Sequence, residues 1–347
     1  MIWVSYIIAI YKEPGSPPKN FEPAPGEWKR WCKKCQLYKP ERAHHCKTCK
    51  KCVLKMDHHC PWTANCVGHD NMPHFLRFLL WVDYTTAYTL YYLFKRLLSY
   101  WNDRNLPAYL ISKVHLTATI VLIPLDFFVL LTVGILTFRC FYHIIVTGMS
   151  QIESWEYERL ESQLSSERLR NKIKHNYELL FGKELKDVTS WSSGANVLRE
   201  PPETNIPFFT VDDLVFPYDL NPWSNLLQAF GYPWNWILPW GKPLGDGLSY
   251  PKNEYANPED QDLSSLPWPP DGGHQDRING EHLFNDTIQD NEQVVQRRMV
   301  HDPRNNMNRT EWYNDFGEKL SDFGVDVEAE TFDTPSAAVG SSSEARE

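Results

Sequence analysis

The longest apolar stretch of the chain covers residues 116–136, LTATIVLIPLDFFVLLTVGIL, and its single charge is Asp126. A bilayer core requires about 20 residues of helix to cross it. The stretch holds fourteen Leu, Ile, Val and Phe residues. Each favours insertion by roughly 0.3–0.6 kcal/mol, which together outweighs the cost of about 3 kcal/mol for one central aspartate. The pattern predicts a membrane-spanning helix over residues 115–146.

A second, weaker apolar stretch covers residues 78–94 and contains Asp83. Its ends carry Arg77, Lys95 and Arg96, whose charged heads can reach water, and Trp and Tyr residues that suit a membrane interface. The sequence predicts a second span over residues 74–96 that depends on neighbouring helices. Because ionisable groups inside a membrane tend to face other helices, we expect Asp83 and Asp126 to form interhelical hydrogen bonds.

Residues 1–11, MIWVSYIIAIY, are apolar but reach only about 16 Å as a helix, half the thickness of a bilayer. They lack the basic start and small-residue cleavage site of a signal peptide. We expect them to be the last half of a transmembrane helix whose beginning is missing from the chain. A short interfacial anchor is the alternative.

Charge is distributed unevenly along the chain. Residues 28–55 contain ten Lys or Arg and one acidic residue, whereas residues 251–347 contain 21 acidic and 8 basic residues. The positive-inside rule places the basic segment in the cytoplasm. Residues 97–114 then form a lumenal loop, and residues 147–245 form a cytoplasmic C-terminal region. Residues 246–347 lack periodicity and are rich in Pro, Gly, Ser, Asp and Asn, which predicts a disordered acidic tail.

Seven of the eight cysteines fall between Cys32 and Cys66, together with His44, His45, His58 and His59. Cytoplasmic thiols stay reduced, so this density favours a metal over disulfides. Zinc takes four Cys or His ligands, and each Cys-x2-Cys step fits a turn that directs two sulfurs at one ion. The sequence predicts a small zinc-binding domain with short β-hairpins over residues 12–73. Two sites of three cysteines and one histidine would leave one cysteine over.

Cys60 is the best candidate for the surplus cysteine, because it directly follows Asp57, His58 and His59. An imidazole with a carboxylate behind it is the usual means of forming a thiolate near neutral pH. The alternative is a purely structural zinc module in which Cys60 is itself a ligand. The residues alone leave both interpretations open. The cluster lies within about twenty residues of a predicted span, where a reactive thiol could meet substrates that reside in the bilayer.

The Asp57-His58-His59-Cys60 motif and the cysteine spacing around it resemble the DHHC-type protein S-acyltransferases, the palmitoyltransferases. Several flanking motifs also fit, although Glu13-Pro14-Gly15 replaces Asp-Pro-Gly and only the glutamate of a Thr-Thr-x-Glu motif remains, as Glu153. The fit extends over Pro61-Trp62, Asn65-Cys66-Val67-Gly68, Asn71, Tyr218-Asp219-Leu220 and residues 225–231. The segments MDHHCPWTANCVGH and TGMSQIESWE are similar in sequence to those of the fungal endoplasmic-reticulum branch of the family, which acylates chitin synthase.

The resemblance implies roles for individual residues. Cys60 would accept a palmitoyl group from palmitoyl-CoA and pass it to cysteines of membrane proteins, with chitin synthase a suggested substrate. His58 would be the base and Asp57 would orient it. Glu153 and Asn225 would be structural. The eight metal ligands would form two interleaved zinc sites, Cys32, Cys35, His45 and Cys52 in one and Cys46, Cys49, His59 and Cys66 in the other.

The expected molecule is therefore an α-helical polytopic membrane protein with a small zinc-stapled cysteine-rich cytoplasmic domain and a disordered acidic tail. The resemblance places it in the endoplasmic reticulum membrane with its active site facing the cytoplasm. The family has at least four spans, so part of the pocket for the acyl chain is expected to be missing. This puts the activity of the chain by itself in question.

Two other function classes compete with an acyltransferase. A zinc-dependent nucleic-acid binder would use the basic residues around the cysteines. The nearby spans and the absence of zinc-finger helix spacing argue against nucleic acid as a partner. A non-catalytic membrane scaffold with a zinc staple would tolerate replacement of Cys60, whereas an enzyme would not.

Overall fold

The computed structural model describes residues 1–107, 109–164, 166–183, 211–236, 238–256, 263–273 and 302–331. These residues form two compact units, each built from three separate stretches of the chain. Unit 1 comprises residues 1–16, 53–151 and 219–250, and unit 2 comprises residues 17–52, 152–218 and 251–347. Residues 12–73, for which the sequence predicts one zinc-binding domain, fall into both units.

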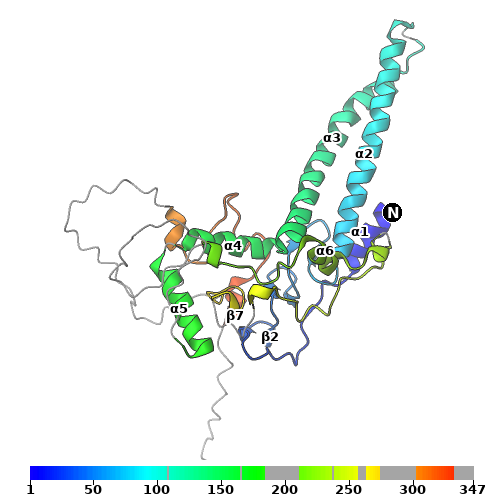
Figure 1. Ribbon diagram of the computed structural model, residues 1–347. Coiled ribbons are helices and arrows are strands. Elements are labelled where there is room, and N and C mark those ends of the chain that lie inside the picture. Colours follow the sequence, from blue (N-terminus) through cyan, green and yellow to red (C-terminus); the bar gives the residue numbers. More distant parts are fainter. Residues whose placement is uncertain are drawn as a thin grey trace, which may run out of the picture. The chain divides into compact units, whose positions relative to one another are not determined.

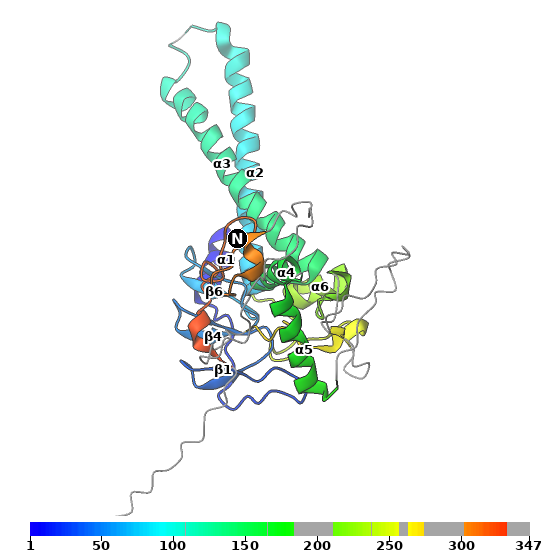
Figure 2. The same cartoon turned by 90° about the vertical axis from the view of Figure 1, so that its left-hand side faces the viewer.

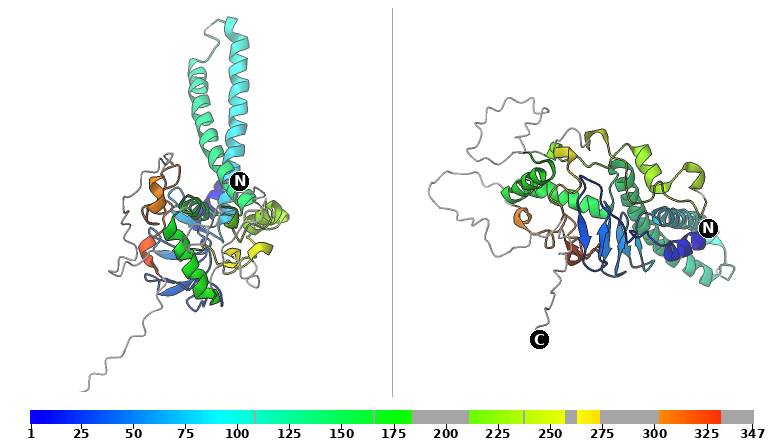
Figure 3. Two further views of the ribbon diagram at one scale, coloured as in Figure 1. Left: turned by 60° about the vertical axis from the view of Figure 1, so that its left-hand side comes forward. Right: turned by 90° about the horizontal axis from the view of Figure 1, so that it is seen from below.

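Unit 1 is built around a long helical hairpin (Figures 1 and 3). Its helices are α1 (Ile2–Tyr11), α2 (Met72–Asn102), α3 (Lys113–Tyr142) and α6 (Pro222–Phe230), and its strands are β5 (His58–Cys60) and β6 (Asn65–Val67). A π-helical turn, His143–Thr147, extends α3, and 3₁₀ turns lie at Asp103–Asn105 and Pro233–Asn235. Helices α2 and α3 lie side by side, and α1 packs against α2.

Local signals set the ends of the two long helices. The side chain of Asn71 precedes α2 and accepts a hydrogen bond from the backbone N–H of Gly68 at 2.8 Å. Pro73 lies in the first turn of α2, where no intrahelical partner for its nitrogen is needed. Ser112 caps α3 by accepting from the N–H of His115. Gly148, with φ of 63°, ends the π-helical turn in a left-handed conformation that glycine adopts without strain.

Side-chain exposure along the hairpin changes abruptly near residue 80. The first residues of α2 are buried, whereas Tyr84, Tyr88 and most of the apolar side chains of α3 are exposed. Within the described residues, one helix, Lys113–Thr147, is long and apolar enough to cross a membrane. It contains the span predicted over residues 115–146. Helix α2 covers the weaker predicted span over residues 74–96 but does not meet this measure, and α1 is too short to do so.

Asp83 forms the interhelical hydrogen bond that the sequence predicts. The hydroxyl of Thr137 on α3 donates to Asp83 Oδ2 on α2 at 2.6 Å. No such bond is described for Asp126, whose Oδ2 is a buried atom without a hydrogen-bond partner among the described residues.

Unit 2 contains short strands, two helices and irregular segments (Figure 2). Strands β1 (Arg30–Cys32) and β2 (Leu37–Lys39) form one hairpin, and β3 (His44–Cys46) and β4 (Lys51–Val53, with Val53 in unit 1) form another. Strand β7 (Glu330–Thr331) joins the free edge of β1, giving the order β2-β1-β7. The helices are α4 (Gln151–Gln163, with Gln151 in unit 1) and α5 (Glu167–Phe181). Short 3₁₀ turns lie at Val211–Asp213, Glu254–Ala256, Leu263–Ser265, Pro303–Asn306 and Val327–Ala329.

The prediction of a disordered acidic tail over residues 246–347 is not confirmed for the described residues. Trp312, Leu320 and Ala329 are each at most 1 % exposed, and Glu330 pairs with Cys32 across the β1–β7 ladder. The acidic side chains that suggested disorder include Asp271 and Glu330, which are buried and paired with basic residues. Residues 257–262, 274–301 and 332–347 of the predicted tail lie outside the described residues.

Candidate active site and metal centres

Two Cys-x2-Cys steps form turns with the same hydrogen-bonding pattern. In the first, the N–H of Cys35 donates to Cys32 Sγ at 3.4 Å, and in the second the N–H of Cys49 donates to Cys46 Sγ at 3.3 Å. The residue after each step, Gln36 or Lys50, has a positive φ. Each of these turns directs backbone donors at a sulfur, which favours the thiolate form that metals bind.

The first cysteine group consists of Cys32, Cys35, His45 and Cys52, all in unit 2. The distances from His45 Nδ1 to the sulfurs of Cys32, Cys35 and Cys52 are 3.4, 3.2 and 3.7 Å. For a tetrahedral zinc with ligand distances of roughly 2.3 Å to sulfur and 2.0–2.1 Å to nitrogen, the ligands lie about 3.6 Å apart. The group therefore has the donor set and spacing that zinc requires.

The second cysteine group consists of Cys46, Cys49, His59 and Cys66, and it too could hold a metal ion. Within unit 1, His59 Nδ1 lies 3.6 Å from Cys66 Sγ, which again matches the spacing around zinc. Cys60 is in neither group.

The β5–β6 hairpin separates the metal ligands from the catalytic residues predicted by the sequence. His58, His59 and Cys60 are consecutive in β5, and successive side chains of a strand point to opposite faces. His59 and Cys66 are directly paired across the hairpin and share one face. His58 and Cys60 share the other. The sequence analysis did not use this alternation, although the period of two in a strand was available from the motif itself.

The three predicted catalytic residues are connected by hydrogen bonds. His58 Nδ1 lies 2.8 Å from Asp57 Oδ2, which leaves Nε2 as the nitrogen available to the hydrogen-bonded thiol of Cys60. Burial lowers the pKa of His58, but its hydrogen bonds with Asp57 and Cys60 outweigh this effect and raise the pKa to about 9. Burial raises the pKa of Cys60, but hydrogen bonds from His58 and Thr63 outweigh this effect and lower it to about 7. The geometry favours a thiolate–imidazolium pair near neutral pH.

The position of Asp57 is fixed by the backbone. Its Oδ1 accepts a hydrogen bond from the N–H of Gln151 at 3.0 Å, and its own N–H donates to Val67 O at 2.9 Å. Asp57 is 4 % exposed. Its carboxylate is therefore held with one oxygen on His58 and the other on the first residue of α4.

Cys60 packs in an apolar cluster formed by the N-terminal part of α2 and the C-terminal end of α3. The side chain is 5 % exposed and shares the cluster with Phe75 and Leu79 of α2, Cys140 of α3, and Phe230 of α6. Cys140 is buried in the same cluster. The nucleophile candidate thus lies where the spanning helix enters the rest of unit 1.

Asn225 forms three hydrogen bonds that support the structural role implied for it by the family resemblance. Its Nδ2 donates to Ile145 O at 3.2 Å and to Asp219 Oδ1 at 2.7 Å, and its Oδ1 accepts from the N–H of Leu220 at 3.1 Å. These bonds tie α6 to the end of α3.

Arg42 and Glu153 form a buried ion pair in unit 2. Arg42 Nε and Nη2 donate to the two carboxylate oxygens of Glu153, each at 2.5 Å. The guanidinium lies 4.6 Å from the ring centroid of Tyr218, whose hydroxyl donates to Glu41. The pairing supports the structural role expected for Glu153. The partner of Glu153 could not be predicted from the sequence, because nothing local links positions 42 and 153.

Comparison with known proteins identifies the family. The family model described as DHHC palmitoyltransferase matches residues 27–158. The palmitoyltransferase PFA4 of Debaryomyces hansenii is 50 % identical over 95 % of this chain and 84 % of its own length. The proteins of the same name from Kluyveromyces lactis and Saccharomyces cerevisiae are 48 % and 43 % identical, each over 95 % of this chain and 87 % of its own length. The chain belongs to the DHHC palmitoyltransferase family.

Proposed function

We propose that this chain transfers a palmitoyl group from palmitoyl-CoA to cysteine thiols of membrane proteins through a thioester on Cys60. The observation that carries the proposal is the hydrogen-bonded sequence Asp57–His58–Cys60, with a Cys60 pKa of about 7. The thiol belongs to neither cysteine group and lies in an apolar cluster at the C-terminal end of the spanning helix. Those are the properties required of a nucleophile that accepts a fatty acyl chain.

In the first step, the Cys60 thiolate attacks the thioester carbonyl of palmitoyl-CoA. A new carbon–sulfur bond forms to Cys60 as the bond to CoA breaks, and protonated His58 can donate its proton to the leaving CoA thiolate. In the second step, His58 removes the proton from a substrate cysteine, which attacks the acyl carbon and releases the Cys60 thiolate. Asp57 stabilises the charged imidazole in both steps. One thioester replaces another, so the protein must mainly provide the thiolate and proximity.

We propose that each cysteine group binds one zinc ion as a structural metal. The three sulfurs and one nitrogen of the first group already have suitable spacing, and the second group has the same donor set. When bound, zinc would hold hairpins whose strands are three residues long and too short to be stable alone. It would leave Cys60 and His58 free for chemistry, because His59 points to the opposite face of β5.

Replacement of Cys60 tests the proposed function. A chain with Cys60→Ala should lose hydroxylamine-sensitive labelling by an alkyne analogue of palmitoyl-CoA and still bind two zinc ions. Cys140→Ala is the matched control, because that thiol is also buried in the cluster and should not be needed for labelling. Retention of the label by Cys60→Ala would contradict the intermediate. Loss of zinc from it would show that Cys60 is a ligand instead.

We propose that both α2 and α3 cross the membrane, with residues 103–112 on the lumenal side. The exposed apolar and aromatic side chains of both helices support this topology. A glycosylation acceptor introduced between residues 105 and 112 should be modified in cells, whereas lack of modification would contradict the topology. Residence in the endoplasmic reticulum and chitin synthase as a substrate remain proposals from the family resemblance. Acyl-exchange analysis of chitin synthase in cells with and without the protein would test the latter.

A further inference from the structure

Residues 324–331, here called the tail clasp, lie far outside the family match yet bond to both hairpins that carry the first cysteine group. On the β1–β2 hairpin, Cys32 pairs with Glu330 and the N–H of Lys33 donates to Ala329 O at 3.0 Å. On the β3–β4 hairpin, the N–H of Asp326 donates to His45 O at 2.8 Å. Cys32 and His45 are themselves members of the first cysteine group. The clasp therefore joins the two hairpins whose separation determines the metal geometry.

The clasp also covers the sulfurs with an apolar side chain. Ala329 is fully buried in a cluster with Cys32, Leu37 and Cys52, against which Cys35 packs. All three cysteines of the first group thus belong to a core that is completed by a residue of the tail. Exclusion of water from thiolate ligands slows their protonation and the loss of a metal.

Glu330 supplies the negative charge in this core. Its Oε1 lies 2.6 Å from Lys39 Nζ and 3.1 Å from His44 Nδ1, while its Oε2 lies 3.3 Å from Arg309 Nη1. The side chain of Lys39 is fully buried, and Glu330 is the carboxylate paired with it. Without Glu330, the ammonium of Lys39 would have no adjacent carboxylate among the described ion pairs. A buried charge without a partner is strongly disfavoured.

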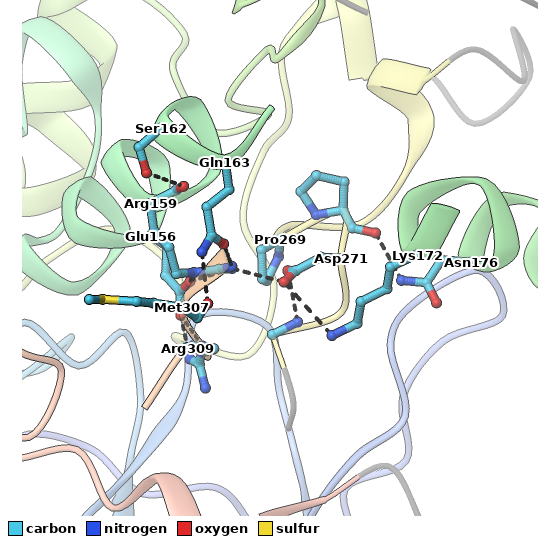
Figure 4. A network of polar contacts seen from close by, with 12 residues as sticks. Glu156, Arg159, Ser162, Gln163, Lys172, Asn176, Pro269, Asp271, Met307 and Arg309 are labelled. Atoms are coloured by element: carbon cyan, nitrogen blue, oxygen red, sulfur yellow. Dashed lines mark hydrogen bonds and ion pairs between the residues drawn. The ribbon is translucent and has the colours of Figure 1, made fainter. Parts of the chain in front are cut away.

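The charges continue from Glu330 into α4 and α5 with alternating sign. Arg309 also pairs with Glu156 of α4, Glu156 pairs with Arg159, and Arg159 pairs with Asp271, which in turn lies near Lys172 of α5. Figure 4 shows Arg159 between Glu156 and Asp271. Every acid in this series has a basic neighbour on each side. The tail segments are therefore bound to the helices of unit 2 as well as to the hairpins.

We propose that the tail clasp is a positioning element of the first cysteine group and that Glu330 is its key residue. The clasp holds β1 and β3 at the separation that the four ligands need, and Glu330 forms the ion pair with the buried Lys39 that anchors the clasp on β2. Zinc at this group is consequently retained only while the clasp is in place. The inference rests on the proposed binding of zinc, and it assigns a function to a segment whose composition suggests disorder.

The test compares two isosteric substitutions two positions apart in the full-length chain, purified in detergent. Glu330→Gln removes the buried charge, whereas Glu328→Gln is the control because that side chain is exposed. Zinc per chain is measured by mass spectrometry, and zinc release is followed with a coloured chelator. Two zinc ions in the unaltered chain would establish the proposed metal sites independently of the clasp.

We expect Glu330→Gln to weaken binding of one of the two zinc ions by about 10- to 100-fold, the usual effect of losing an outer-shell partner. The other zinc ion should be released at the unaltered rate, and Glu328→Gln should release both ions normally. Equal release from Glu330→Gln and the unaltered chain would overturn the proposal. Zinc release that is accelerated as much by Glu328→Gln as by Glu330→Gln would also overturn the proposal.

A double variant separates loss of the clasp from general misfolding. In Lys39→Met/Glu330→Gln both members of the buried pair are neutral, so much of the zinc affinity should return. Should Glu330→Gln give no folded protein, Asp326→Asn provides a milder change, because its partner Lys34 is 52 % exposed. A few-fold faster release of one zinc ion from Asp326→Asn would support the clasp. Unaltered release from it, together with no recovery in the double variant, would refute it.

Discussion

Replacement of Asp57 by asparagine tests whether the carboxylate controls the ionisation of Cys60 through His58. Asp57 lies 2.8 Å from His58 Nδ1 and is a main reason why the pKa of His58 is raised to about 9. Asparagine keeps the size of the side chain and can still accept from the N–H of Gln151. It removes the charge, so burial should dominate and the pKa of His58 should fall. A neutral His58 would no longer stabilise the Cys60 thiolate.

The magnitude follows from the pKa of the thiol. At pH 7, Cys60 with a pKa of about 7 is half ionised, whereas a thiol at the ordinary value of 9.0 is about 1 % ionised. The thiolate fraction therefore falls by up to about 50-fold. Nucleophilicity rises with pKa with a slope of roughly 0.4–0.5, so each remaining thiolate reacts about 6–10 times faster. The net loss at pH 7 is up to about 5–8-fold.

The assay is the rate of Cys60 alkylation by iodoacetamide between pH 6 and 10, with the modified peptide identified by mass spectrometry. In the unaltered chain the rate should rise with a midpoint near pH 7, and in Asp57→Asn the midpoint should move toward pH 9. Asp246→Asn is the control, because that carboxylate is exposed in the same unit. A midpoint that stays near 7 in Asp57→Asn would show that Cys60 is activated without the carboxylate.

Two further predictions concern the buried polar contacts. Arg42→Met should destabilise the chain by about 3–5 kcal/mol because Glu153 is left buried without its partner. Chemical unfolding measures the loss, and the double variant Arg42→Met/Glu153→Leu should recover much of it; no recovery would mean that the pair is not the cause. Asn225→Ala should lower the free energy of unfolding by about 1–3 kcal/mol for each backbone group that it leaves unpaired, at Ile145 and at Leu220. Gln228→Ala on the same helix is its control, and equal thermal shifts in the two would contradict the anchor role.

The Cys-x2-Cys turns could be predicted from the sequence because the relevant information is local, whereas the assignment of ligands to two interleaved groups came from the family resemblance. Cys-x2-Cys spacing by itself indicates a turn with two sulfurs on one side, and the structure forms such turns at Cys32 and Cys46. The apolar run in α3 is equally local, since length and composition suffice to recognise a span. The hydrogen bonds of Asp83 and Asn225 also agree with the sequence analysis. The turns and the span each follow from a short window of sequence, whereas the partners of Asp83 and Asn225, Thr137 and Ile145, lie 54 and 80 positions away.

The role of the tail could not be predicted because its charges are stabilised by residues far away in sequence. A segment with many acidic residues and no periodicity resembles a solvated chain when its partners are unknown. Glu330 is buried beside Lys39, almost three hundred positions earlier in the chain, which supplies its counter-charge together with Arg309. The same holds for Asp271, whose pKa is held well below its usual range despite burial, by the charges of Arg159, Lys172 and Arg309. The composition of a segment carries no information about its partners, whereas these acidic side chains are held in place by ion pairs with distant basic residues.

The order of residues in β5 resolves a conflict between metal binding and catalysis. Zinc withdraws electron density from a cysteine ligand, so a coordinated Cys60 would be a weaker nucleophile toward an acyl group. A histidine bound to zinc through one nitrogen is also impaired as a base. The strand alternation places His59 on the face of Cys66 and leaves His58 and Cys60 on the other. Insertion of one residue between His58 and Cys60 would place the thiol on the opposite face of the strand from His58 and break the connection between them. The two histidines of the motif are therefore not interchangeable, and a metal can hold the hairpin rigid while the thiol one residue away remains reactive.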